Sequence, residues 1–91
     1  MTQELEKIEE EKLIGKVTHY FDNIGVAVIK LDDTLKTGDR IRIVGGTETD
    51  FEQTVESMES EHEKIETAQA GDVIGLKVNQ KVREGYKVYK L

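Results

Sequence analysis

The sequence predicts an all-β protein, a small closed antiparallel barrel of six or seven strands. Three observations lead to this prediction. Several short runs are rich in β-branched residues, the runs end at Gly or Asp, and they follow one another closely along the chain. With 91 residues, the chain has material for a single hydrophobic core. We therefore expect one domain over residues 13–91, preceded by a charged tail over residues 1–12.

Residues 1–12 differ in composition from the rest of the chain. They carry five glutamates and two lysines, and beyond the initiator methionine only Leu5 and Ile8 are apolar. Such a segment cannot bury enough apolar surface to offset the entropy lost on ordering. The composition predicts a disordered tail or a frayed helical turn, and in either case a segment that adds nothing to the stability of the domain.

The strands are predicted in order along the remaining chain. Residues 13–31 (LIGKVTHYFDNIGVAVIKL) hold two strand-like runs separated by the turn residues Asp22 and Asn23. In residues 39–46, Ile41 and Ile43 alternate with arginines, which is the period-2 pattern of a half-buried strand. Residues 72–78 (DVIGLKV) and 86–91 (YKVYKL) supply later strands. The predicted core is Ile14, Val17, Val26, Val28, Ile41, Ile43, Val55, Met58, Ile65, Ile74, Leu76, Val78 and Val88.

Residues 51–66 do not follow the strand pattern. Their apolar and imidazole side chains fall at spacings of 4, 3, 4 and 3 (Phe51, Val55, Met58, His62 and Ile65), which is typical of an amphipathic helix. Nearby threonines and the Gly45-Gly46 pair instead favour a strand entered through a hairpin. Periodicity alone favours the helix.

The distribution of charge argues against a broadly basic surface. The net charge is −6, and residues 51–66 carry six glutamates and one lysine, whereas residues 67–91 carry a net charge of +3. A domain that grips nucleic acid along its whole surface is usually basic. The chain has no cysteine and no apolar run long enough to span a membrane. We expect a cytoplasmic protein with no membrane partner.

Three motifs resemble one known domain. Residues 55–78 (VESMESEHEKIETAQAGDVIGLKV) resemble the second domain of the archaeal and eukaryotic counterpart of elongation factor Tu, with its Val-x-Ser-(Val/Met)-Glu strand and its Gly-Asp-x-(Val/Ile)-Gly turn. Residues 35–45 (LKTGDRIRIVG) and 82–91 (VREGYKVYKL) resemble two further turn-and-strand motifs of that domain, in the same order. The resemblance covers residues 13–91. It implies a translation-factor domain-two-like barrel in which residues 51–60 form a strand. A bulge in that strand would move Met58 onto the core side.

The resemblance also implies a function. The nucleotide-binding motif G-x-x-x-x-G-K-[ST] is absent, so the chain cannot act as a translation GTPase by itself. The resemblance implies a non-catalytic module that binds a partner of the translation or RNA-handling apparatus. We expect a protein partner, with only weak contact to RNA or the ribosome in isolation; the oligomeric state stays open. The alternative is an accessory subunit of a larger enzyme, because such a barrel also resembles the C-terminal domain of the collagenase-like peptidase family, some of whose members act in RNA modification.

No catalytic, metal or cofactor site is predicted. His19 and His62 are the only imidazoles, and a metal centre needs three or four converging ligands. Ser57 and Ser60 lack the sharp glycine elbow that presents a nucleophile. The six glutamates of residues 51–66 are best explained as a solvated acidic face.

The candidate contacts with a partner or RNA come from the resemblance and from the basic C-terminal quarter. Glu59 matches the glutamate that, in elongation factor Tu-like proteins, helps to bind the 3′-terminal adenosine of aminoacyl-tRNA. The family's next residue, a methionine, is Ser60 here, so a solvated strand residue is the favoured interpretation of Glu59. The full candidate set is Glu59, His62, Lys77, Lys81, Arg83 and Lys87.

Overall fold

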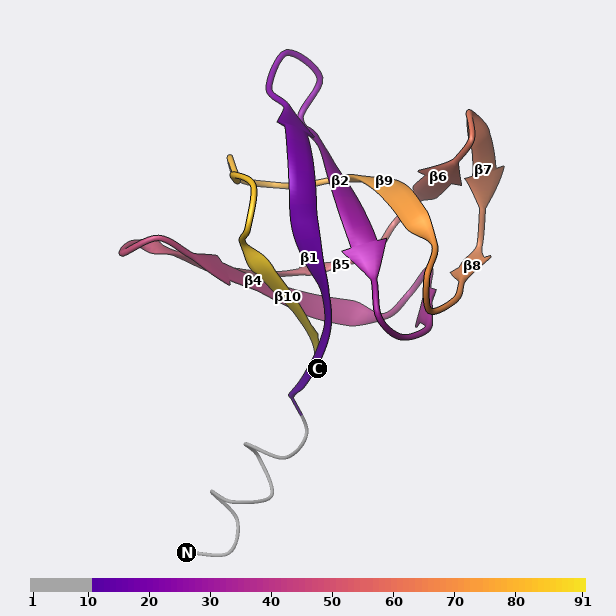
Figure 1. Cartoon of the computed structure of the whole chain (residues 1–91), viewed down its shortest axis with the longest axis horizontal. Coiled ribbons are helices and arrows are strands. Elements are labelled where there is room, and N and C mark those ends of the chain that lie inside the picture. Colours follow the sequence, from indigo (N-terminus) through magenta and orange to yellow (C-terminus); the bar gives the residue numbers. More distant parts are fainter. Residues whose placement is uncertain (1–10) are drawn as a thin grey trace, which may run out of the picture.

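The computed structural model describes residues 11–91, which form ten antiparallel strands (Figure 1). Alternation of apolar and polar residues, together with Gly or Asp at the turns, explains why most of these segments are extended. The strands are β1 (Lys12–Phe21), β2 (Val26–Leu31), β3 (Leu35–Lys36), β4 (Arg40–Gly45), β5 (Thr49–Thr54), β6 (Met58–Ser60), β7 (Glu63–Ile65), β8 (Thr67–Ala68), β9 (Val73–Lys77) and β10 (Lys87–Lys90). The all-β prediction is confirmed.

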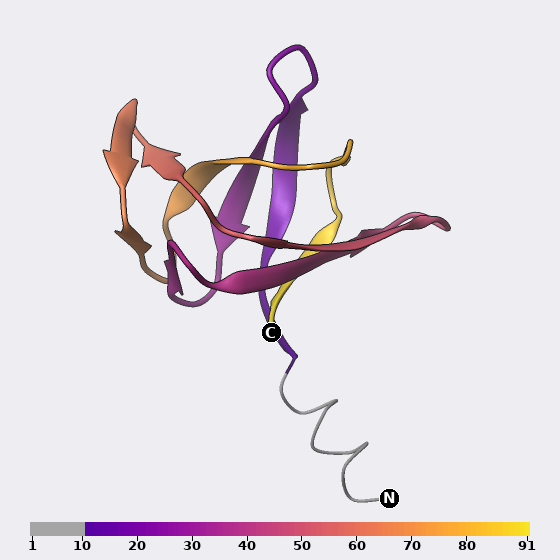
Figure 2. The ribbon, with the colours of Figure 1, turned by 180° about the vertical axis from the view of Figure 1, so that it is seen from behind.

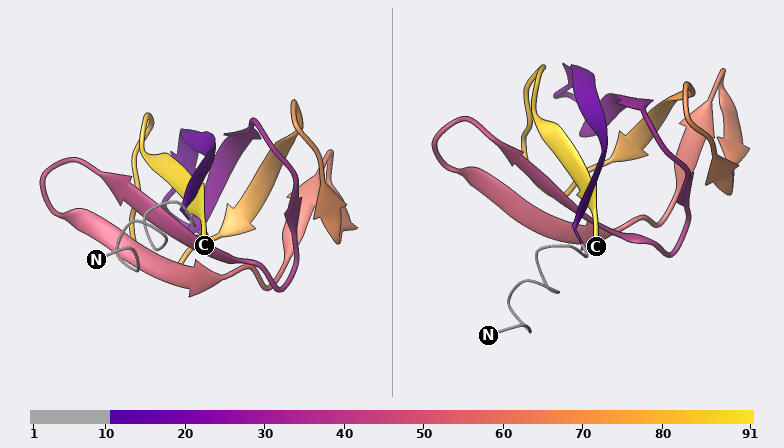
Figure 3. Two further views of the ribbon diagram at one scale, coloured as in Figure 1. Left: turned by 90° about the horizontal axis from the view of Figure 1, so that it is seen from below. Right: turned by 60° about the horizontal axis from the view of Figure 1, so that its bottom comes forward.

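Eight strands form one sheet in the order β5-β4-β10-β1-β2-β9-β6-β7, and β3 pairs with β8 in a small second sheet. The prediction of a closed barrel with six or seven strands is wrong in both respects. Within residues 11–91, no backbone pairing joins the end strands β5 and β7. The sheet curves strongly instead, and β4 and β5 run across the direction of β1 and β2 (Figures 2 and 3). The extra strands β3, β7 and β8 have only two or three residues, too few to show a period in the sequence.

Residues 51–66 contain the end of β5 and the strands β6 and β7. The family resemblance implied a strand for residues 51–60, whereas the periodicity favoured a helix. Phe51, Gln53 and Val55 alternate into the interior, and then Met58 is buried opposite Leu76 of β9. The break between β5 and β6 shifts the inward phase by one residue. This shift produces the helix-like spacing in the sequence, because a strand of constant phase would have placed residues 57 and 59 inside.

The core lies on the concave side of the sheet. Its fully or nearly fully buried apolar side chains are Ile14, Val17, Ala27, Ile29, Leu31, Leu35, Ile41, Ile43, Phe51, Val55, Met58, Ala68, Ile74, Leu76, Val78, Val82 and Val88. Ten of the thirteen predicted core residues are in this set. Ile65 packs against the core but is only half-buried.

In strand β2, the side chains that point into the core are the opposite set from the predicted one. Val26 and Val28 are only half-buried, whereas Ile29 and Leu31 are fully buried. The reason is that Lys30 shares the parity of the two valines, and a lysine cannot be placed in this small core without a partner. A strand has a period of two, so placing Lys30 outside turns Ile29 and Leu31 inward.

Arg42 links β4 to two other segments. Its guanidinium donates to both carboxylate oxygens of Glu11 at 2.9 Å and to Asp50 on β5 at 2.7 and 2.8 Å. The hydrogen bond from Arg42 holds the pKa of Asp50 below its ordinary value. Glu11 directly precedes β1, so its ion pair with Arg42 links the start of β1 to β4. The predicted disordered tail falls mostly on residues 1–10, which lie outside the described residues.

The burial of β2 can be tested with a matched pair of substitutions. Ile29→Ala removes three buried carbons and should lower the free energy of unfolding by about 2–4 kcal/mol. Val28→Ala, on the half-buried face of the same strand, should cost less than about 1 kcal/mol. Urea unfolding followed by circular dichroism measures both values. A larger loss for Val28→Ala than for Ile29→Ala would show that the strand has the other phase.

The Arg42 network predicts a specific acid dependence. Because the folded pKa of Asp50 is lowered, its stabilisation is present above the ordinary carboxyl value of about 3.9 and is lost as the pH falls through the folded value. Asp50→Asn should therefore destabilise the protein near neutral pH and make its loss of stability below about pH 4 shallower. Urea midpoints between neutral and strongly acidic pH provide the measurement. In an Arg42→Gln background, the same Asp50→Asn change should have little further effect; an equal effect there would contradict the assignment.

Candidate functional site

The convex, outer face of the sheet carries a groove, which we call the outer groove. It runs over β2, β9 and β6 and has a volume of about 380 Å³, with an adjoining hollow of about 200 Å³. The two share the residues Ile24, Val26, Glu59 and Gly75. The other residues lining the larger hollow are Phe21, Val28, Ser60, Glu61, His62, Val73 and Ile74.

Gly75 forms the floor of the outer groove. It faces Val28 on one side and Glu59 on the other, in the middle of β9. A Cβ atom at this position would lie 3.4 Å from Val26 Cγ1, in ordinary contact, so the backbone itself does not require glycine there. Glycine within a strand weakens the strand but allows another group to approach the backbone closely. The missing side chain is therefore what opens the groove.

The walls of the outer groove are apolar and unusually exposed. Phe21, Ile24 and Val73 have relative exposures of 44%, 56% and 49%. Val26 and Val28, the half-buried valines of β2 that were predicted to lie in the core, extend this apolar surface. Phe21 is held by an edge-on contact with His19, whose ring centroid lies 4.5 Å away. A contiguous exposed apolar surface of this kind is typical of an interaction site.

The rim of the groove is the hairpin that joins β6 and β7. Its two turn residues, Glu61 and His62, both have positive φ angles, of 53° and 70°. A two-residue hairpin turn needs this conformation, yet asparagine and glycine are the residues that adopt it easily. Histidine also adopts positive φ more often than most residues, whereas glutamate rarely does, so the local strain lies at Glu61. Such strain is concentrated at functional sites. It supports a role for the rim as a contact surface.

The structure separates the six residues predicted to contact a partner, all of which are exposed. Glu59 and His62 lie at the outer groove, and Lys77 lies at the end of its smaller hollow. Lys81 and Arg83 are on the connection between β9 and β10, and Lys87 opens β10. They do not form one patch. The apolar walls were missed, although Phe21 and Ile24 flank the predicted Asp22-Asn23 turn, where side chains are commonly exposed.

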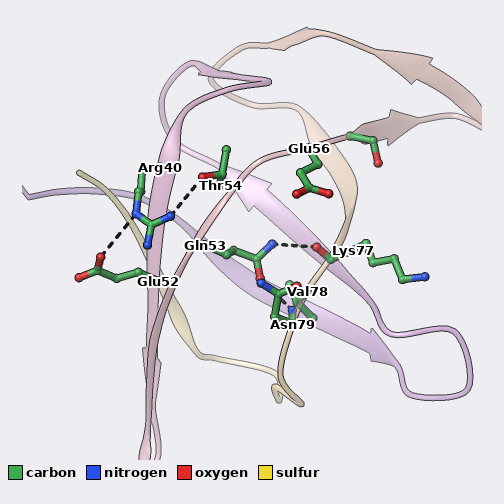
Figure 4. A pocket seen from close by; sticks show the side chains of 9 residues that line it. Arg40, Glu52, Gln53, Thr54, Glu56, Lys77, Val78 and Asn79 are labelled. Atoms are coloured by element: carbon green, nitrogen blue, oxygen red, sulfur yellow. Dashed lines mark hydrogen bonds and ion pairs between the residues drawn. The ribbon is translucent and has the colours of Figure 1, made fainter.

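A second and more polar hollow, of about 660 Å³, lies between β5 and the end of β9 (Figure 4). Gln53, only 5% exposed, is the one buried polar residue in the part of the chain that the structure describes. Its amide donates to the carbonyl oxygen of Lys77 at 2.9 Å and accepts from the backbone N–H of Asn79 at 2.8 Å. Arg40 closes one side by bonding to Thr54. The hydrogen bonds of Gln53 thus form a structural bridge between β5 and the end of β9 at this hollow.

The histidines take part in local contacts. His19 Nδ1 lies 3.8 Å from a carboxylate oxygen of Glu84, and both side chains are exposed. Among the described residues, no group of three or more His, Asp or Glu side chains is arranged to hold a metal ion. Within residues 11–91, no helix is long and apolar enough to cross a bilayer.

The Gln53 bridge can be tested by an isosteric substitution. Gln53→Met leaves a backbone donor and a backbone acceptor without their partner and should lower the free energy of unfolding by about 1–3 kcal/mol. Glu52→Gln, a change to an exposed neighbour on the same strand, should shift it by less than about 1 kcal/mol. Urea unfolding measures both, and equal effects would argue against the bridge. Slowed amide exchange at Asn79 in the unaltered protein, lost in the Gln53 variant, would localise the effect.

Comparison with known proteins identifies the fold. The family model for elongation factor Tu domain 2 matches residues 34–88. Two solved structures of the C-terminal domain of a candidate U32 peptidase from Geobacillus thermoleovorans superpose with TM-scores of 0.80 and 0.83. They cover 85% and 88% of this chain and 96% and 92% of those domains, at 19% and 20% identity. At this identity, the likeness concerns the fold alone.

Relatives with higher identity are named as peptidases. An uncharacterized protease of Methanocaldococcus jannaschii is 42% identical over 78 residues, covering 86% of this chain and 19% of that protein. A collagenase of Porphyromonas gingivalis is 33% identical over 85 residues, covering 92% of this chain and 24% of the collagenase. The chain thus spans about a fifth to a quarter of the length of these relatives.

These relatives overturn one prediction. A binding module of the translation or RNA-handling apparatus is contradicted, because the similar proteins are a protease and collagenases. The sequence motifs were specific for the fold, which translation factors and peptidases share, and not for either function. By its fold and its family match, the chain belongs to the elongation factor Tu domain 2 family.

Proposed function

We propose that this chain is an accessory, non-catalytic module of a peptidase-family protein. The observation that carries the proposal is its 42% identity to a protease and its 33% identity to a collagenase, each over more than four-fifths of the chain. Both matches occupy a minor part of the relative, which leaves room elsewhere in those proteins for the machinery of peptide cleavage. The module supplies a binding surface, and the hydrolysis takes place outside it.

The outer groove is the surface that fits this role. Phe21, Ile24 and Val73 expose apolar area that would be removed from water when a protein segment covers the groove. Gly75 at the floor lets an apolar side chain of that segment approach the backbone. The occupant we propose is a segment of the peptidase-family protein that carries the catalytic part, so the groove positions the module against it. This proposal assigns the outer groove to the protein partner expected from the sequence.

A chimera tests the proposed function. The 85 residues of the Porphyromonas gingivalis collagenase that match this chain would be replaced by the corresponding residues of this chain. Collagen cleavage by the chimera should exceed that of a collagenase in which the same residues are deleted. The isolated chain should release no peptides from collagen. A chimera as inactive as the deletion, or cleavage by the isolated chain, would contradict the proposal.

The same chimera tests the outer groove. Phe21→Ser combined with Ile24→Ser should reduce collagen cleavage about tenfold, the loss typical of removing buried apolar contacts at an interface. The matched control is Leu13→Ser, which alters a residue with 46% exposure that does not line the groove. Cleavage by the control should change less than about twofold. Equal losses in the two proteins would remove the groove from the proposal while leaving the accessory role intact.

A further inference from the structure

Three lysines face one another across three adjacent strands. Lys87 of β10 pairs in register with Lys16 of β1, and Lys16 pairs on its other side with Lys30 of β2. All three side chains are exposed on the outer face of the sheet. Figure 1 shows these strands side by side. We call this set the lysine row; with strands about 4.8 Å apart, it is about 10 Å long.

The lysine row costs stability. Facing residues have Cβ atoms about 4.5–5.5 Å apart, and like charges placed directly opposite each other destabilise a sheet. Lys16 has a like charge on both sides. None of the three lysines forms an ion pair within residues 11–91, whereas Lys12, Arg40, Arg42 and Lys90 do. Asp32, next along the chain from β2, is an acidic residue near the row and does not form an ion pair with Lys30 in the described residues.

The row lies outside the outer groove but beside it. Lys30 pairs with Val73, which forms part of the groove wall, while Lys87 pairs with Val44 of β4 at the other end. Among the described residues, the row is therefore a line of three cations without an ion-pair partner, bounded in register by valines. Such a line suits an extended, negatively charged ligand.

We propose that the lysine row binds an extended acidic segment of a protein. Along such a segment, the side chains on one face repeat about every 6.7 Å, so two successive carboxylates fit within the length of the row. Each lysine ammonium would donate hydrogen bonds to a carboxylate and relieve its repulsion from its neighbours. This site shares no residue with the outer groove and goes beyond the accessory role proposed above.

Local chemistry favours an acidic protein segment over a nucleic acid. Valines flank the row in register at both ends, and Tyr89, which shares the outer face of β10 with Lys87, is half-buried. Surfaces that bind single-stranded nucleic acid instead place aromatic rings beside their cations to stack the bases. The row is also too short for a long polyanion. The glutamates of β5, β6 and β7 lie at both ends of the eight-strand order and would repel a phosphate chain that continued past the row.

The test is an NMR titration of the isotopically labelled chain. The probe is a peptide in which glutamate alternates with serine, compared with the same peptide carrying glutamine and with an oligothymidylate of equal net charge. We expect the glutamate peptide to shift the signals of Lys16, Lys30 and Lys87 and of their strand neighbours. Replacing all three lysines with glutamine should raise the Kd about tenfold. The matched control, Lys36→Gln with Lys64→Gln and Lys81→Gln, should change it less than about twofold.

Each other outcome overturns the proposal. Equal losses in the two triple variants would show attraction by charge without a site. Tighter, row-dependent binding of the oligothymidylate would make the row a nucleic-acid surface. Signals that shift only outside β10, β1 and β2 would place the contact elsewhere. Folding is monitored separately by urea unfolding, in which Lys16→Gln should raise the midpoint, since it removes both like-charge contacts.

Discussion

One buried side chain, that of Gln53, links two strands that lie far apart in the order of the curved sheet. Strands β5 and β9 are far apart in the order of the sheet, and the backbone groups of Lys77 and Asn79 face β5 across the interior. An amide side chain has both a donor and an acceptor, so Gln53 satisfies both groups at once. A buried carbonyl or N–H without a partner would be costly, and an apolar residue could satisfy neither. The bridge therefore holds β5 and the end of β9 together across the interior of the curved sheet.

The position of β9 then determines the outer groove. With the end of β9 held by Gln53, alternation sends Ile74 and Leu76 into the core and turns Gly75 outward. The outward position has no side chain, and its neighbours on β2 are the half-buried valines, which leaves an apolar hollow between two strands. The alternation that buries Ile74 and Leu76 thus opens a surface on the opposite side of the sheet. A module can therefore keep its core while other residues on the outer face change what it binds.

The sequence predicted the features that depend on local pattern. The β4 alternation of Ile41 and Ile43 was confirmed because arginines mark its outer face without ambiguity. In β2 the continuous run of apolar residues does not show which alternate side chains face the core, although the position of Lys30 alone would have indicated it. The turn at Glu61 and His62 was not predicted, because the pair lacks the Asn-Gly or Asp-Gly signal of a two-residue hairpin turn and glutamate rarely adopts positive φ.

The candidate site illustrates a different limit. The basic residues that the sequence groups together, in residues 67–91, are dispersed by the fold. Lys16, Lys30 and Lys87 come from distant parts of the chain, and only the pairing register brings them into one line. Counting charges along the chain reveals basic residues that are close in sequence. A sheet also brings together residues that are distant in sequence, at positions set by its turns and bulges. The bulge between Val17 and His19 turns His19 and Phe21 to the outer face that Lys16 occupies, since a shift of one residue changes which side chains share that face. Two surfaces of different chemistry, one apolar and one cationic, thus lie side by side on strands β1 and β2.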